Sequence, residues 1–349
     1  MPKITSRSTI KINLPSVVFG TSSLGNLYVA LSDEIKLNIV KECISHTNGQ
    51  VVFDSAGKYG AGLALESLGK CLTALDVDQK DVLISNKLGW LRTALTTPEP
   101  TFEPGVWKEL KYDAVQCINY DGIMQCFEQG NQLLKNYIPQ LVSVHDPDEY
   151  LAKAHSEVEK KKLYDDILDA YRALADLKAS GQVKAIGIGS KDWRVIEMIA
   201  GDVKLDWVMF ANSMTIKSHP GELLTFMKKL NKDGVQIINS AVFHSGFLIG
   251  GDFYDYKKVC AGTAKDDELL QWRDDFFKLC SKYQIKPAEA CVQFALKAPG
   301  VESIALNTSN PNRVEDNVKM ANALIPVEFW DEMVLKGMID KLFFEEFIC

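Results

Sequence analysis

Four polar side chains stand at or just beyond the ends of short apolar runs, and together they could transfer protons. Asp54 ends one such run, and Tyr59 follows it five residues later. Lys87 and His145 each end a further run. If the runs are successive strands of one parallel barrel, all four side chains converge at one mouth of that barrel. A carboxylate, a phenol, an amine and an imidazole in one pocket form a proton-transfer device.

Tyr59 is the predicted acid/base of this group. A free phenol has a pKa of about 10, so it must become more acidic to exchange a proton near neutrality. The Lys87 ammonium would stabilise the phenolate, Asp54 would orient Lys87, and His145 would hydrogen-bond the substrate oxygen. A hydride must accompany that proton, which implies a nicotinamide. Taken singly, each residue also has an ordinary reading as a turn cap, a solvated lysine or a turn histidine.

Eight short runs rich in β-forming residues must position these side chains, and a helical pattern follows each run. This alternation predicts the α/β class and a (β/α)8 TIM barrel with extended loops at its C-terminal mouth. The competing doubly wound fold needs a Gly-x-Gly-x-x-Gly turn after its first strand, and neither 60–62 nor 187–189 completes one. The predicted strands are 17–20, 50–54, 81–87, 140–145, 183–189, 206–211, 235–242 and 301–306.

Start and stop signals place the helices. Ser32 precedes an acidic turn and an apolar stripe, which predicts a helix that begins after it. Gly181 is a suitable end for a helix over 163–180. Asn310 followed by proline predicts the start of a helix that continues through Ala323.

The segment after the eighth strand is the predicted phosphate site. Free N–H groups and the positive end of the dipole make a helix N-terminus suited to phosphate, and barrels commonly bind phosphate after strands seven and eight. The guanidinium of Arg313 could add a forked contact. A simple capped helix is the alternative.

Two segments lie outside the eight strand–helix units of a minimal barrel. Residues 1–16 alternate in polarity and predict a hairpin that plugs the bottom of the barrel. Residues 90–119 form a long loop after strand three, and such a loop at a catalytic mouth is usually a lid or a substrate wall. Trp90 is the candidate to stack on a pyranose face, with packing inside an ordered loop as its alternative. No repeat or linker divides the chain, so we expect one domain over residues 1–349.

The composition and charge of the chain argue against several classes of binding partner. The chain of 349 residues is 46% hydrophobic and carries a formal charge of −7 without a basic run, which argues against nucleic acid and anionic membranes. The eight cysteines form no Cys-x-x-Cys pair, and the chain starts without an apolar signal segment, so we expect a cytoplasmic protein with reduced thiols. No apolar run approaches the ~18 residues of a membrane helix. No pair of histidines or carboxylates has metal spacing, so we predict no metal.

The sequence resembles the aldo-keto reductases over roughly residues 14–338. The most specific motif is Phe-Asp-Ser-Ala ending at Ala56, with Tyr59 behind it and then Glu66-Ser-Leu-Gly. Lys87 in Ser-Asn-Lys-Leu-Gly and His145 in Val-His-Asp-Pro-Asp complete the catalytic tetrad that the resemblance implies.

Within that family the chain is most similar to the aldose dehydrogenase branch, the D-threo-aldose 1-dehydrogenases and L-fucose dehydrogenases. The stretches 239–246 and 325–330 carry this similarity. The branch implies oxidation of the anomeric carbon of a sugar to a lactone, with Tyr59 accepting the hydroxyl proton. The substrate contacts expected on this reading are Trp90, Tyr59 and His145.

The resemblance also implies a cofactor site with departures from the family pattern. Lys191 follows Ser190 where an asparagine is usual, and Asp316 stands in place of a glutamate. Asn307 occupies the place of a lysine in NADP-preferring members, so NAD is favoured and NADP remains possible. The implied cofactor residues are Gly20, Thr21, Asp54, Ser190, Asn212, Phe243, Ser245, Gly246, Leu248, Asn307, Thr308, Ser309, Arg313, Asp316 and Asn317.

Three other readings share this barrel. A lyase would form a Schiff base at Lys87 with a carbonyl substrate. A regulatory subunit would bind the nicotinamide without turning over, as the beta subunits of potassium channels do. An enzyme of the same class could act on another carbonyl, such as pyridoxal. We expect a small-molecule sugar or carbonyl substrate, and a monomer or small homo-oligomer.

Overall fold

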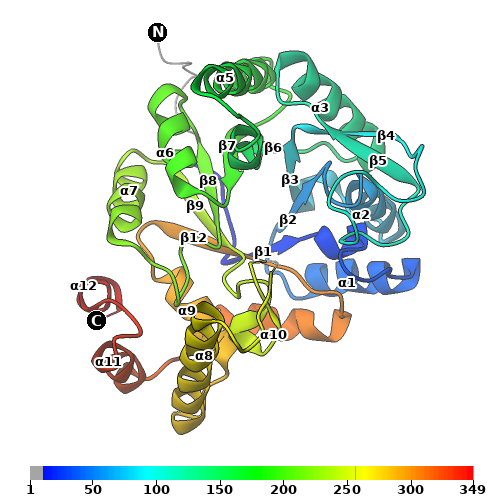
Figure 1. The fold of residues 1–349 in the computed structure, drawn as a ribbon. Helices are drawn as coiled ribbons and strands as arrows, with labels where there is room; N and C mark the ends of the chain where they lie inside the picture. The colour runs from blue at the N-terminus through cyan, green and yellow to red at the C-terminus, as the bar shows by residue number, and fades with distance from the viewer. Residues whose placement is uncertain (1–10, 256, 349) are drawn as a thin grey trace.

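Eight parallel strands form a closed barrel at the centre of the computed structural model, which describes residues 11–255 and 257–348 (Figure 1). The strands follow chain order around the barrel, and the last one closes against the first. The (β/α)8 prediction is confirmed, with each strand within a few residues of its predicted place. The strands are β1 Val17–Gly20, β2 Val51–Ala56, β3 Val82–Leu88, β6 Leu141–His145, β7 Ala185–Ser190, β8 Trp207–Ala211, β9 Gln236–Ser240 and β12 Val301–Leu306.

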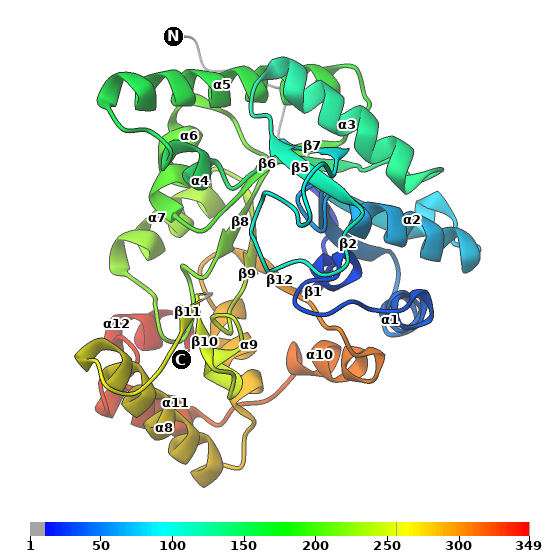
Figure 2. The same ribbon diagram turned by 45° about the vertical axis from the view of Figure 1, so that its right-hand side comes forward.

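Helices surround the barrel and cover its outer face (Figures 1 and 2). None of those in the described residues is long and apolar enough to cross a membrane. Their bounds are α1 Asp33–Ser45, α2 Leu63–Ala74, α3 Tyr120–Leu134, α4 Pro147–Leu151, α5 Glu157–Ala179, α6 Trp193–Asp202, α7 Gly221–Lys232, α8 Ala264–Lys282, α9 Pro287–Leu296, α10 Val314–Met320, α11 Val327–Leu335 and α12 Lys341–Phe343.

The capping signals work as predicted at three of the helix ends, and at one of them the Asn310 side chain accepts a hydrogen bond from the backbone N–H of Asn312 at 3.0 Å. The Ser32 hydroxyl accepts a hydrogen bond from the backbone N–H of Ile35 at the start of α1. Gly181, with a φ of +77°, lies just past the end of α5. The predicted helix through Ala323 is too long, because the backbone changes to i→i+3 hydrogen bonds after Met320. It begins with the 3-10 turn η4, Pro311–Arg313.

The inside of the barrel is filled by apolar side chains, and the chain before β1 closes its lower end. Ile12 and Leu14 pack on the buried interior cluster, whose largest side chain is Trp207. The backbone of Ile12 exchanges two hydrogen bonds with the side-chain amide of Gln236, the first residue of β9. Residues 11–16 contain no strand, and the rest of the predicted hairpin, 1–10, lies outside the described residues.

The long segment after β3 is more ordered than the predicted loop. It contains an antiparallel pair, β4 Trp90–Ala94 and β5 Tyr112–Gln116, joined by residues 95–111, which we call the mouth loop. Figure 1 shows this hairpin at the outer edge of the barrel, between α3 and α2. The backbone of the mouth loop also bonds to the loop after β1, where Lys108 N–H donates to the Asn26 carbonyl at 3.0 Å. A smaller antiparallel pair, β10 Phe253–Tyr254 and β11 Lys257–Lys258, follows β9.

Candidate active site

Asp54 and Lys87 form a buried ion pair across neighbouring strands. The register of β2 and β3 places Asp54 opposite Ser85 and Ala56 opposite Lys87. The Lys87 ammonium donates to Asp54 Oδ2, and the Ser85 hydroxyl donates to Asp54 Oδ1 at 3.0 Å. Both charged side chains are almost completely buried. Each carboxylate oxygen therefore has a donor, and the lysine is fixed in place.

Tyr59 lies in the turn between β2 and α2, next to this ion pair. The Lys87 nitrogen is 4.9 Å from the centre of the Tyr59 ring. The His145 ring at the end of β6 lies edge-on to the same phenol, with 5.5 Å between ring centres and 85° between planes. The structure thus brings Asp54, Tyr59, Lys87 and His145 together at the C-terminal mouth of the barrel.

Burial raises the pKa of Tyr59 to about 12, although the Lys87 ammonium opposes that rise. The sequence argument expected the opposite net shift, because it counted the ammonium and not the loss of water around the phenol. Burial alone would lower the pKa of Lys87, but Asp54 and the phenol raise it above its ordinary value. A lysine held protonated is a poor nucleophile, which argues against the Schiff-base reading.

His145 is held in its neutral form. Burial, followed by the positive charges of Lys87 and Lys58, lowers its pKa well below 6.5. Its Nδ1 is buried and has no hydrogen-bond partner among the described residues. Its Nε2 lies 3.5 Å from a carboxylate oxygen of Asp146. A neutral imidazole can donate one hydrogen bond, so His145 suits a substrate oxygen rather than an anion.

Two buried side chains at this mouth were not singled out by the sequence analysis. Lys58, directly before Tyr59, is a buried lysine with three carboxylate partners. Trp107 of the mouth loop is also buried, and its ring lies 5.9 Å from that of Tyr59. Lysine is mostly an exposed residue, so nothing in the local sequence indicated its burial.

Trp90, the residue predicted to stack on a sugar ring, packs between Lys58 and Phe102. The Lys58 nitrogen sits over its ring at 5.3 Å, and the Phe102 ring packs on it at 5.8 Å. The Trp90 side chain is half-buried between these groups. This packing matches the alternative reading, and of the two tryptophans Trp107 is the one in ring contact with Tyr59.

Apart from Asp54 on β2, the predicted cofactor residues lie on the other half of the rim. Gly20 ends β1 and Thr21 follows it, Ser190 ends β7 and Asn212 follows β8. The Thr21 hydroxyl donates to the carbonyl of Asp54 at 3.1 Å, which joins the two halves.

The loop after β9 carries four further predicted cofactor residues. Gly246, at a φ of +90°, leads into the 3-10 turn Phe247–Ile249, whose Leu248 is buried. Ser245 also has a positive φ, of 58°, so the backbone bends sharply here. Phe243 and Ser245 are partly exposed beside it.

Asn307, the first residue after β12, ties the rim to the loop after β1. Its amide oxygen accepts from the Ser23 hydroxyl at 2.8 Å, and its amide N–H donates to the Ser22 hydroxyl at 2.9 Å. The next predicted cofactor residues follow in the same segment and in α10. Of these, Ser309, Arg313 and Asp316 are exposed, Thr308 is partly exposed and Asn317 is buried.

The rim contains an acceptor that fits the carboxamide of a nicotinamide. Asn212 adopts a φ of 60°, and its Oδ1 is buried without a partner among the described residues. An unpaired buried acceptor is costly, so a ligand N–H would stabilise it. Lys191 differs from this pattern, since its ammonium contacts Glu149 at 2.5 Å.

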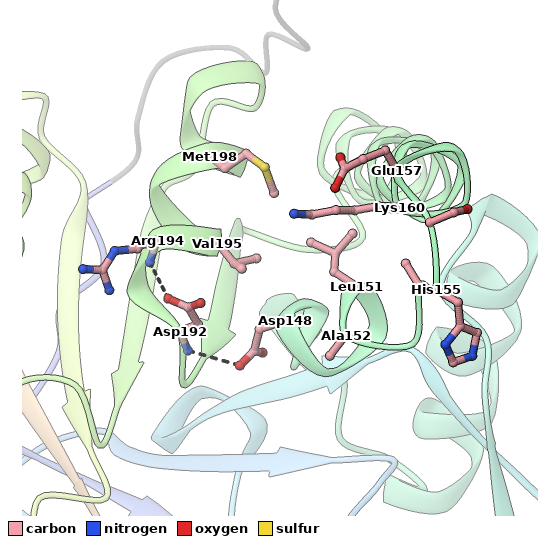
Figure 3. Close-up of a pocket in the computed structure, with 12 residues that line it drawn as sticks. Asp148, Leu151, Ala152, His155, Glu157, Lys160, Asp192, Arg194, Val195 and Met198 are labelled. Atoms are coloured by element: carbon pink, nitrogen blue, oxygen red, sulfur yellow. Dashed lines mark hydrogen bonds between the residues drawn. The ribbon is translucent and has the colours of Figure 1, made fainter.

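A separate hollow of about 730 Å³ lies outside this mouth, between α4, the start of α5 and α6 (Figure 3). Its lining includes Asp148, which accepts a hydrogen bond from the Asp192 backbone N–H at 3.1 Å. None of the four predicted catalytic residues lines it. Within the described residues, no group of three or more histidine, cysteine and acidic side chains could hold a metal ion.

Comparison with known proteins gives consistent matches over nearly the whole chain. The sequence model of the Aldo/keto reductase family matches residues 16–335. Pyridoxal 4-dehydrogenase of Microbacterium luteolum is 27% identical, with 94% of this chain and 95% of that protein covered. D-threo-aldose 1-dehydrogenase of a Pseudomonas species is 25% identical, with 93% and 95% covered. The solved structure of an aldo-keto reductase from Bacillus halodurans matches with a TM-score of 0.66 at 16% identity, over 97% of this chain and 96% of that one.

Proposed function

The chain belongs to the aldo/keto reductase family, whose members bind nicotinamide cofactors, and we propose that it oxidises the anomeric carbon of an aldose to a lactone. The observation that carries this proposal is the buried Asp54–Lys87 pair beside the Tyr59 phenol, with the His145 imidazole edge-on to it. Proton transfer at one oxygen, coupled to hydride transfer at the carbon that bears it, is the chemistry this arrangement supports.

In the proposed reaction a cyclic hemiacetal loses two hydrogens. The O–H proton passes to Tyr59, and the bond electrons form the C=O of the lactone as the C–H hydride leaves. An oxidised nicotinamide, when bound, would accept that hydride. The predicted cofactor residues on the β7–β1 half of the rim would hold it, with the Asn212 oxygen free to accept from its carboxamide.

Lys87 and Asp54 act on the acid/base rather than on the substrate. The ammonium stabilises the phenolate as it forms, and the carboxylate keeps the ammonium charged and in place. His145 stays neutral and donates a hydrogen bond to the substrate oxygen, which fixes the reacting carbon. In the reverse direction the phenol donates its proton to a carbonyl oxygen.

Pyridoxal is the second candidate substrate, because one of the two relatives described above is a pyridoxal 4-dehydrogenase. Aldoses and pyridoxal share a chemical feature, since each closes its aldehyde onto one of its own hydroxyls as a cyclic hemiacetal. Oxidation of either ring gives a lactone. We therefore place the substrate class at cyclic hemiacetals, with aldoses first.

NAD is the proposed cofactor. NADP requires a cation for its 2′-phosphate, and the amide of Asn307 stands where such a cation is expected. That amide is already engaged by Ser22 and Ser23. The exposed Arg313 is the one predicted cofactor residue that could serve the phosphate instead.

The test is the absorbance of reduced nicotinamide after mixing the purified protein with NAD or NADP and a panel of free aldoses, L-fucose and pyridoxal. Reduction of NAD by one stereochemical set of sugars, with a lactone product that hydroxylamine traps, is the expected result. Activity only with pyridoxal would change the substrate, and activity only as an aldehyde reductase would overturn the direction. Tight cofactor binding without turnover in either direction would favour the regulatory subunit.

A further inference from the structure

Lys58 is a buried cation that bridges three separate segments at the barrel mouth. Its ammonium lies 2.9 Å from Glu103 Oε1, 3.2 Å from Asp146 Oδ2 and 2.8 Å from Glu149 Oε2. Burial alone would lower the pKa of Lys58, but Asp146, Glu103 and Glu149 together raise it above its ordinary value. The cation is therefore fully charged and fully paired.

Only one of these three partners comes from the mouth loop. Glu103 belongs to residues 95–111, whereas Asp146 follows β6 directly and Glu149 lies in α4. Asp146 and Glu149 are fixed to the barrel, because the Asp146 backbone bonds to Gly189 at 3.0 Å and Lys191 pairs with Glu149. The Lys58–Glu103 contact consequently ties a projecting loop to a rigid rim.

Glu103 also holds the side chain of Trp107, which packs against the Tyr59 phenol. Its second oxygen, Oε2, accepts a hydrogen bond from Trp107 Nε1 at 2.7 Å. The Trp107 ring packs at 5.9 Å from the Tyr59 ring, with 32° between their planes. Leu27, from the loop after β1, pairs with Trp107 through a backbone bridge on the other side. One continuous chain of contacts thus runs from Lys58 to Tyr59 through the mouth loop.

We propose that Lys58 is a positioning residue that sets substrate selection, because it holds Glu103 and so keeps Trp107 beside Tyr59 as one wall of the substrate pocket. This inference rests on the proposed function for its substrate, a ring that packs on Trp107. The restraint itself needs no substrate. A purely structural lysine would affect only stability, whereas a positioning lysine changes the binding of the ring more than the chemical step.

The test uses two variants that break the Lys58–Glu103 contact, one charge-conserving variant and one control at a neighbouring position. Lys58→Met removes the cation, and Glu103→Gln keeps Lys58 paired with the other two carboxylates, so it folds even if Lys58→Met does not. Lys58→Arg restores the charge. Glu99→Gln removes an exposed carboxylate of the same mouth loop and serves as the matched control.

The first readout is trypsin cleavage after Lys108 and Lys111 in the protein without ligands. Both lysines are exposed in the mouth loop, and the cleavage rate reports how often the loop opens. Loss of a charged hydrogen bond should speed cleavage about tenfold or more in Lys58→Met and Glu103→Gln. Lys58→Arg and Glu99→Gln should remain near the wild-type rate. Unchanged cleavage in both contact-breaking variants would overturn the restraint, whatever the activity.

The second readout separates KM from kcat for the sugar or pyridoxal that the wild type oxidises. We expect KM to rise about tenfold or more in both contact-breaking variants, with kcat changed by less than about threefold. A loss confined to kcat would overturn the positioning role. A wild type that oxidises no hemiacetal, combined with fast cleavage of the Glu103→Gln loop, would refute the proposed function and leave the restraint standing.

Discussion

Replacement of Lys87 by methionine should displace the pH profile of the proposed oxidation to higher pH. In that direction Tyr59 must accept a proton, so the reactive form is the phenolate. With a pKa of about 12, the phenol is almost entirely protonated near neutrality. Oxidation should therefore speed up about tenfold for each unit of pH below that pKa. Loss of the ammonium raises the pKa of Tyr59, so each rate is reached only at a higher pH.

The size of the displacement follows from the geometry. The charge on Lys87 lies 4.9 Å from the centre of the Tyr59 ring. At an effective dielectric constant of about 20, two unit charges at this separation interact by about 3 kcal/mol, which corresponds to a roughly 100- to 300-fold smaller phenolate population. The variant also leaves Asp54 without its partner, which should destabilise the fold by about 3–5 kcal/mol.

The assay is the initial rate of nicotinamide reduction from about pH 6 to about pH 10, a range below the pKa of Tyr59 in which the phenolate fraction rises about tenfold per pH unit. Lys87→Met is compared with the double variant Asp54→Asn/Lys87→Met, which removes both charges, and with Ser85→Ala, which keeps both. Circular dichroism establishes that each variant is folded. A Lys87→Met rate that falls by much less than about 100-fold at every pH would refute the electrostatic argument, and Lys87 would then act only through placement.

Four further outcomes are expected. Tyr59→Phe should lower turnover by about 10²–10⁴-fold while cofactor binding, followed by tryptophan fluorescence, stays near normal; retained turnover would end its assignment as acid/base. His145 has a pKa well below 6.5, so the substrate KM should stay constant from about pH 8 down to about pH 6; a rise on acidification would contradict the neutral imidazole. Asn307→Lys should raise kcat/KM with NADP relative to NAD about tenfold or more, and Asn307→Ala should not. Asp206→Asn should reduce the free energy of unfolding in urea by about 3–5 kcal/mol, because this buried carboxylate pairs with Lys178 at 2.7 Å.

The barrel could be predicted because its strands are buried on both faces. Runs such as 235–242 have the continuous apolar character that a parallel strand needs, and a helical pattern separates each run from the next. Once the strands were placed, Asp54, Lys87 and His145 had to meet, since the C-terminal ends of parallel barrel strands share one rim.

The features that were missed depend on contacts distant in sequence. Lys58 is buried because Glu103 and Asp146 surround it, and neither is near it in the chain. The β4–β5 hairpin forms within the predicted loop over 90–119, and its prolines, Pro98, Pro100 and Pro104, all lie in 95–111 between the two strands. The sign of the Tyr59 pKa shift was wrong for a similar reason, since burial is a property of the whole mouth.

Because the barrel closes between β1 and β12, it cannot close during synthesis until the ribosome has made β12. About 280 residues must be added after β1 before β12 exists, which takes a ribosome roughly 15–60 s at 5–20 residues per second. Throughout that interval one edge of β1 has no partner strand and can pair with another chain. A truncation before Val301 would make this state permanent and leave two open edges, on β1 and β9. A late stop codon would therefore yield an aggregating sheet rather than a weakened enzyme.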